Sequence, residues 1–259
     1  MNASSFRPVV ATAAITLAAG VTAANAQGLP AATPDRADQA IPVVVIVRVP
    51  RPWYALKAVV VGKMRDTVPQ YAKMPGLMFK AFSFERDSGD FGGLYFWRDR
   101  ASAEAWFDPA WFERVRKERG AEAQVRIFDA PISVDNTPGG TPADNNSQAV
   151  GTLVEIPILA GVTRERLVAE FKAAVPTYQK VPGLLRKHFI VSSNGQFGGV
   201  YLWQDEASAR AWFSDALHAR VIKTYGQDAK IEWFDTPILL PTQDTANVAA
   251  AQALVVAAP

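Results

Sequence analysis

The chain has 259 residues, of which 49% are hydrophobic and 20% charged, a composition typical of a protein that folds around a buried core. Lysine and arginine total 27 against 25 aspartate and glutamate residues, so the basic excess that nucleic-acid binding requires is missing. Cysteine is absent and histidine occurs only at His188 and His218, which excludes disulfides, a cysteine nucleophile and a multi-histidine metal site. We therefore expect no nucleic-acid partner, no metal and no other cofactor.

The N-terminal segment predicts an export signal. Arg7 is the only charged residue in 1–26, an apolar stretch covers 9–24, and the segment ends on the small residues of Ala24-Asn25-Ala26. The stretch is rich in Ala, Thr and Gly and falls short of the roughly 20 strongly apolar residues that span a membrane, which disfavours an anchor. We expect cleavage after Ala26, a periplasmic or secreted mature protein, and no membrane association after cleavage.

An internal repeat organises the rest of the chain. MPGLMFKAF at 74–82 recurs as VPGLLRKHF at 181–189, and FGGLYFWRDRASAEAWF at 91–107 recurs as FGGVYLWQDEASARAWF at 197–213. The second copy is one residue shorter between these blocks, a change that a hairpin loop tolerates. The repeat predicts one domain at 42–133 and another at 150–241, with linkers at 27–41 and 134–149 and a flexible tail at 242–259.

Each repeat begins with a strand and a helix. The β-branched run at 43–49 is typical of a strand, and its counterpart lies at about 152–158. In the second repeat Thr163 is a suitable N-cap for the helix that follows. Pro69 and Pro176 are expected to bend or end this helix.

The remainder of each repeat predicts a hairpin, a broken helix and a last strand. The hairpin strands are expected at 77–86 and 91–98, and at 184–192 and 197–204. Asp99 and Asp205 should cap the helix, and Asp108-Pro109, matched by Ser214-Asp215 in the second repeat, should start its second piece. The second piece should end at Gly120 and Gly226. The last strand is expected to end at Phe128-Asp129 or Phe234-Asp235.

The resulting order, β-α-β-β-α-β twice, predicts an α+β chain of two tandem ferredoxin-like domains. Both faces of the strand at 91–98 carry large apolar groups, whereas helices cover only one face of such a sheet. We therefore expect the two sheets to close into a pseudo-dimeric α/β barrel within one monomeric chain. Arg48 and Arg126 are replaced by Glu155 and Glu232 in the second repeat, which places these charges near the contact between repeats; exposed edge charges are the alternative.

Several of these residues carry a resemblance to a known family. Pro-Gly-Leu followed by Lys80 or Lys187, then Gly-Gly-x-Tyr, Asp99 or Asp205, Ser-Ala and a closing Phe-Asp-x-Pro resemble the YdhR-type monooxygenases of the dimeric α/β-barrel superfamily. The resemblance covers both repeats. It implies ferredoxin-like units paired into a barrel, with pockets between helices and sheet for aromatic, polyketide-like or haem ligands. It supplies no catalytic residues, and fold does not establish function.

Candidate binding residues recur at equivalent positions. Aromatic rings can stack on a planar ligand, and a partly buried lysine can bind an anion. The candidates are Lys80, Tyr95, Trp97 and Trp106 in the first repeat and Lys187, Tyr201, Trp203 and Trp212 in the second. Alternatively, the rings are ordinary core aromatics, and the lysines extend to the surface or pair with a carboxylate.

Two candidate catalytic residues occur in the second repeat only. His188 and Arg186 replace Ala81 and Phe79 of the first repeat, and their spacing places them on one face of a strand. His188 is a candidate general base toward a phenol or enol, and Arg186 a candidate partner for the resulting oxyanion; a solvated edge position is the alternative. His218 is expected to be a packed or surface side chain.

These patterns predict an exported, cofactor-independent monooxygenase that acts on a small aromatic or enolisable substrate. The protein would deprotonate and desolvate the substrate, whose carbanion then reacts with oxygen. One alternative is a non-catalytic periplasmic binding protein for a small apolar or aromatic ligand, and another is a structural or partner-binding role. An enzyme requires a pocket with converging ionisable groups, whereas a binding protein can have two equally apolar pockets.

Overall fold

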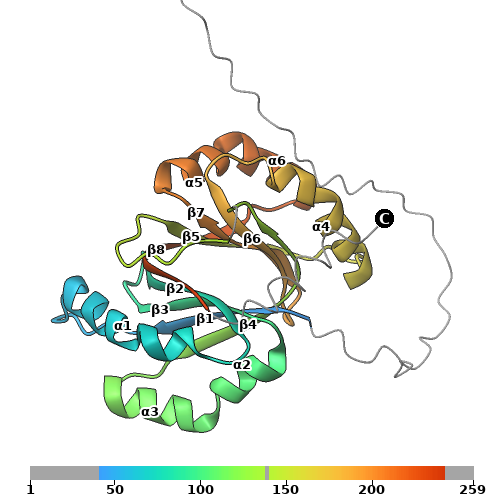
Figure 1. Cartoon of the computed structure of the whole chain (residues 1–259). Helices are drawn as coiled ribbons and strands as arrows, with labels where there is room; N and C mark the ends of the chain where they lie inside the picture. The colour runs from blue at the N-terminus through green and yellow to red at the C-terminus, as the bar shows by residue number, and fades with distance from the viewer. Residues whose placement is uncertain (1–40, 138–139, 243–259) are drawn as a thin grey trace, which may run out of the picture.

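The computed structural model describes residues 41–137 and 140–242 (Figure 1). The first half of the fold comprises β1 (Val43–Val49), α1 (Lys57–Ala72), β2 (Leu77–Glu85), β3 (Phe91–Trp97), α2 (Arg100–Trp106), α3 (Pro109–Arg119) and β4 (Gln124–Asp135). The second half comprises β5 (Val150–Pro157), α4 (Arg164–Tyr178), β6 (Leu184–Val191), β7 (Gln196–Trp203), α5 (Glu206–Trp212), α6 (Asp215–Tyr225) and β8 (Lys230–Pro241). The predicted export signal lies outside the described residues.

The strands form one closed barrel in the order β1-β3-β2-β8-β5-β7-β6-β4, with every neighbouring pair antiparallel. Each half supplies a block of four strands, and the blocks join where β2 meets β8 and where β4 meets β6. The helices lie outside the barrel, with α1 to α3 on one side and α4 to α6 on the other (Figure 1). The predicted closed barrel is therefore confirmed.

The last strand of each half is longer than its sequence indicates. Gln124–Asp129 of β4 pairs with β1, and the strand then continues to Asp135 along β6 of the other half. Likewise, β8 pairs with β5 up to Asp235 and continues along β2 to Pro241. The prediction that these strands end near Asp129 and Asp235 was therefore wrong. Pro131 and Pro237 do not end the strands, because each lies at an irregularity where the strand changes partner. Such a position tolerates a residue without a backbone N–H.

The helix ends follow the predicted capping residues, with one difference. The Asp99 and Asp205 side chains accept hydrogen bonds from the amides of Ser102 and Ser208, and the left-handed Gly120 and Gly226 end α3 and α6. Ser214, in contrast, makes no side-chain cap.

The helices also continue past the prolines that were expected to bend or end them. Pro69 and Pro176 lie inside α1 and α4, which run on to Ala72 and Tyr178. The final turn therefore places Tyr71 and Tyr178 above the sheet.

The strand β3 buries apolar side chains on both of its faces. On β3, Leu94 and Phe96 join the barrel interior, a cluster to which both halves contribute, whereas Tyr95 and Trp97 pack under the helices. The interior face lacks helices and is covered only by the opposite sheet. This arrangement accounts for the two apolar faces that the sequence shows.

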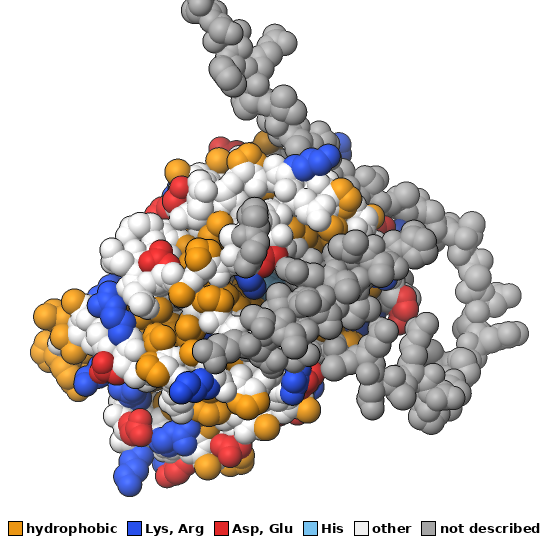
Figure 2. All heavy atoms as spheres, in the orientation of Figure 1, with side chains coloured by type: hydrophobic (Ala, Val, Ile, Leu, Met, Phe, Trp, Pro, Cys, Tyr) orange, Lys and Arg blue, Asp and Glu red, His pale blue; other side chains and the backbone are white. Residues whose placement is uncertain are grey.

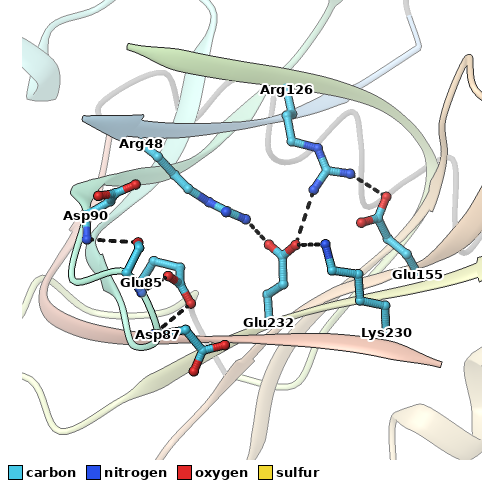
Figure 3. Close-up of polar contacts among 9 residues, drawn as sticks. Arg48, Glu85, Asp87, Asp90, Arg126, Glu155, Lys230 and Glu232 are labelled. Atoms are coloured by element: carbon cyan, nitrogen blue, oxygen red, sulfur yellow. Dashed lines mark hydrogen bonds and ion pairs between the residues drawn. The ribbon is translucent and has the colours of Figure 1, made fainter. Parts of the chain in front are cut away.

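One end of the barrel interior is charged (Figure 3). Arg48 of β1 and Arg126 of β4 extend across the interior to Glu232 of β8, at 3.6 Å for Arg126, and Arg126 also pairs with Glu155 of β5. The two glutamate side chains are 7% and 8% exposed, so water screens these contacts little. The prediction that these four charges meet between the halves is confirmed, and the edge-charge alternative is wrong.

The visible surface carries charges of both signs (Figure 2). Basic and acidic side chains are interspersed on this face, without a broad area of one sign. Apolar side chains gather at the left edge of the view, over the segment before α1, where Trp53 is 91% exposed and Tyr54 71%. No helix in the described part of the chain is long and apolar enough to cross a membrane.

Candidate active site

A cavity of about 530 Å³ lies in the second half, between the outer face of the sheet and helices α4 to α6. Its volume is in the range of small-molecule sites. Its wall is mostly apolar and includes the aromatic residues Phe171, Tyr178, Phe189, Phe197, Tyr201 and Trp212. Such a lining favours an apolar ligand with a flat face.

The structure places three of the four second-half binding candidates at this cavity. Lys187, Tyr201 and Trp212 line it. Trp203 is fully buried behind them, and its Nε1 donates a hydrogen bond to Thr152 Oγ1 at 3.2 Å. Trp203 therefore belongs to the core rather than to the cavity wall.

Lys187 is enclosed by aromatic rings. Its Nζ lies 3.2 Å from the ring centre of Tyr178, 3.9 Å from that of Phe189 and 4.6 Å from that of Tyr201. The residue is 2% exposed, and no carboxylate among the described residues forms an ion pair with it. Burial lowers the pKa of the Lys187 ammonium well below its ordinary value, while the ring faces favour the charged form. The amine is thus a desolvated polar group in an apolar wall.

The first half repeats this lysine site. Lys80 Nζ lies 3.2 Å from the ring centre of Tyr71, 3.8 Å from that of Phe82 and 4.4 Å from that of Tyr95. Neither lysine reaches the surface or pairs with a carboxylate in the described part of the chain, contrary to the alternatives considered from sequence. Trp97 is fully buried and Trp106 partly buried in the hydrophobic cluster that also contains Tyr95.

The paired glycines of the repeat make room for these lysines. A Cβ on Gly198 would lie 2.0 Å from the carbonyl oxygen of Val154, so the first glycine permits the close approach of β7 to β5. A Cβ on Gly199 would lie 3.0 Å from Cε of Lys187 and 2.8 Å from the Tyr201 ring. The second glycine therefore leaves space for the buried lysine side chain.

One substitution on the helix distinguishes the two halves. Trp111 of α3 is 6% exposed and packs edge-on against Phe107, with ring centres 5.0 Å apart. The aligned residue in α6 is Leu217, which lines the cavity beside Phe213, the counterpart of Phe107. The smaller side chain leaves open in the second half a space that an indole occupies in the first.

The cavity mouth carries a histidine and a carboxylate that the sequence analysis did not assign to a site. His218 and Asp228 both line the cavity, and His218 Nδ1 lies 2.9 Å from each Asp228 carboxylate oxygen. Arg220 and Lys223 of α6 line it as well. The available signal was the replacement of Phe112 in the first repeat by His218 in the second.

The predicted catalytic pair lies on the other face of β6. His188 stacks on Phe96 in the barrel interior, with ring centres 4.1 Å apart, and it is not among the cavity-lining residues. Arg186 pairs with Asp135 at 2.5 Å and donates a hydrogen bond to Thr141 Oγ1 at 2.7 Å. The two residues share one face, as their spacing indicates, but the cavity opens on the face of Lys187. Their catalytic role remains a prediction from sequence.

Comparisons with known proteins agree with this architecture. Residues 50–136 match the family model described as "Putative mono-oxygenase ydhR". No curated protein matches the chain. The matched segment is the first half, whereas the cavity lies in the second. The family resemblance seen in the sequence is confirmed for that segment.

Solved structures show the same fold. A putative monooxygenase from Fusobacterium nucleatum is 14% identical, with a TM-score of 0.58 over 79% of this chain and 96% of its own. An anthrone oxidase-like protein is 12% identical, with a TM-score of 0.54 over 79% and 95%. A putative monooxygenase from Lactobacillus acidophilus is 9% identical, with a TM-score of 0.51 over 78% and 96%. Because each alignment exceeds one half of this chain, both halves take part.

The buried His188 predicts acid sensitivity of the fold. Burial, together with Arg186, lowers the pKa of His188 to about 3, below the roughly 6.5 of an unfolded chain. The unfolded state therefore binds a proton first, and stability is lost as the pH falls from about 6.5 toward 3. We expect His188 to account for a loss of about 2.5 kcal/mol between pH 7.5 and pH 4.5.

A His188→Phe variant, which keeps a ring against Phe96, should lack this part of the pH dependence. Urea unfolding at several pH values measures it, and His218→Gln, which removes the other histidine, serves as a control. Equal losses in the wild type and in His188→Phe would contradict the assignment.

Proposed function

We propose that the second-half cavity binds a small aromatic or enolisable molecule and that the protein oxygenates it with O₂, using no resident cofactor. The observation that carries this proposal is the aromatic-lined cavity on which ionisable groups converge, namely Lys187, His218 and Arg220. A cavity built only to hold an apolar molecule does not require them.

The proposed reaction converts an activated methylene into a carbonyl. The substrate loses a proton, and its carbanion transfers electrons to O₂. One oxygen atom forms the new C=O bond, and the other leaves as water together with the two hydrogens of the methylene. The substrate is oxidised and O₂ is reduced, so no further reductant is needed.

The residues of the cavity suit the steps before oxygen reacts. The rings of Tyr178, Tyr201 and Trp212 can hold a planar substrate and exclude water, which strengthens electrostatic contacts inside the cavity. Cationic side chains at the mouth favour the deprotonated substrate. The similarity of the fold to an anthrone oxidase-like protein supports a tricyclic ketone such as anthrone as the first substrate to try.

The proposal includes the finer features that the sequence predicts. The matching element order of the two halves supports a duplicated ferredoxin-like unit as the origin of the barrel. Residues 1–26 support export, so that the reaction takes place outside the cytoplasm on a chain that begins at Gln27.

Oxygen uptake with anthrone tests the proposed function. Protein purified from the periplasm, with Gln27 expected at its N-terminus, should consume one O₂ for each anthraquinone formed, at a rate at least about tenfold above that of heat-denatured protein. Uptake at the background rate would overturn the proposal. Saturable binding of anthrone, seen as quenching of tryptophan fluorescence, without oxygen uptake would favour the binding-protein alternative, which the mostly apolar wall also fits.

A further inference from the structure

His218 and Asp228 are arranged as a histidine held by a carboxylate. His218 lies near the start of α6, and the left-handed Gly226, with φ of 76°, turns the chain so that Asp228 comes back to it. Both carboxylate oxygens lie 2.9 Å from Nδ1, and Oδ1 also accepts a hydrogen bond from the amide of Ala229 at 2.8 Å. A carboxylate at Nδ1 favours the tautomer whose Nε2 can accept a proton.

The position of this pair allows a proton to enter and leave. Both residues line the cavity, yet the side chain of His218 is 33% exposed and that of Asp228 47%. A proton taken from a bound molecule can therefore pass to solvent without opening the fold. Buried His188 has no such route.

The pair and the open cavity occur in the same half. At the positions aligned with His218 and Asp228, the first half has Phe112 and Glu122, and where Leu217 opens the cavity it has the buried Trp111. The half with the described cavity is thus the half with a histidine at its opening.

The other ionisable groups that line the cavity favour the binding of an anionic ligand. Arg220 and Lys223 come from α6 and Lys187 from β6, while Asp228 is the only carboxylate that lines the cavity among the described residues. The hydroxyl groups come from Tyr178, Tyr201, Tyr225 and Thr224. Burial raises the pKa of Tyr178, and Arg220 acts in the opposite direction, as it would for any acid bound nearby.

From these contacts we infer that His218, oriented by Asp228, is the proton acceptor of the cavity, and that its ligands are enols, phenols and ketones with an activated methylene. The C–H or O–H bond of the ligand breaks, the proton moves to Nε2 of His218, and the electron pair remains on the ligand as an enolate or phenolate near Arg220. This inference rests on the proposed function only for the later step with oxygen, because the proton transfer itself needs no oxidant.

A phenol whose anion is coloured tests the transfer without turnover. We expect 4-nitrophenol bound to the wild type at pH 6 to show the nitrophenolate absorption band, because the acceptor and the cations stabilise the anion. In His218→Gln the ionised fraction of the bound probe should fall at least about fivefold. Asp228→Asn should give an intermediate loss, and Asp228→Glu, which introduces the residue of the first half, a smaller one.

Matched variants separate this role from a structural one. Phe112→Gln changes the aligned, partly exposed position of the other half and should leave the bound spectrum unchanged. Thermal unfolding of each variant checks the fold. An unchanged ionised fraction in His218→Gln, or the absence of bound nitrophenolate in the wild type, would overturn the inference.

Turnover provides the second measurement. With anthrone and O₂, His218→Gln should lower kcat at least about 100-fold while KM changes less than about threefold, since a general base acts on the bound substrate. If the wild type ionises nitrophenol through His218 but consumes no oxygen, the proposed oxygenation fails and the proton acceptor stands. If His218→Gln oxygenates anthrone at the wild-type rate, the proton acceptor fails and the oxygenation stands.

Discussion

A Leu217→Trp variant should fold normally and bind anthrone at least about 100-fold more weakly than the wild type, a loss of about 2.7 kcal/mol. The introduced indole has a template in Trp111, which packs on Phe107 at the aligned position of the first half. Against Phe213 it should fill the cavity in the same way and bury additional apolar surface. Isothermal titration with anthrone and urea unfolding measure the two effects.

The reciprocal change in the first half is the control. Trp111→Leu should leave the affinity of the second-half cavity unchanged and lower the free energy of unfolding by about 1 to 3 kcal/mol, because it leaves a void in a packed core. If Leu217→Trp retains wild-type affinity for anthrone, the ligand binds elsewhere and the proposed site is wrong.

Replacing Glu232 by glutamine should lower the free energy of unfolding by about 3 kcal/mol. Glu232 contacts Arg48, Arg126 and Lys230, and its side chain is only 8% exposed. Glutamine keeps the size of the side chain but removes its charge, which breaks the ion pair that Arg48 forms in the barrel interior. Guanidinium unfolding at neutral pH, with unchanged m-value, measures the loss.

An exposed pair provides the comparison. Glu113 and Arg116 lie one helical turn apart on α3, with side chains 64% and 58% exposed. Glu113→Gln should therefore change stability by less than about 0.5 kcal/mol. If both glutamine variants behave alike, the interior charges contribute little to holding the two sheets together.

Much of the fold could be predicted from local signals. The aspartate caps and the glycine helix ends each act over a few residues, so they are readable from sequence alone. The barrel followed from the two apolar faces of the strand at 91–98 and from the exchange of Arg48 and Arg126 for glutamates. The ends of the last strands could not be predicted, because the extensions after Pro131 and Pro237 are stabilised by strands of the other half.

The candidate site could be predicted from the sequence less well than the fold. Lys187, Tyr201 and Trp212 were predicted from the repeat, but periodicity shows only that His188 and Lys187 lie on opposite faces of β6, not which face meets a cavity. The pairing register of β6 with β7 also shifts between Leu184 and Arg186, just before these two residues, and periodicity does not show such a shift. The open space depends on how deeply residue 217 enters the core, and His218 becomes relevant only because Asp228 returns to it across a loop.

Closing the barrel within one chain also frees its two halves from symmetry. In a dimer of identical subunits, a leucine that opens one pocket opens the other, and the packing lost is lost twice. Here the joints of β2 with β8 and of β4 with β6 belong to a single polypeptide, so each side can change alone. One half can therefore be packed for stability while the other keeps an open cavity.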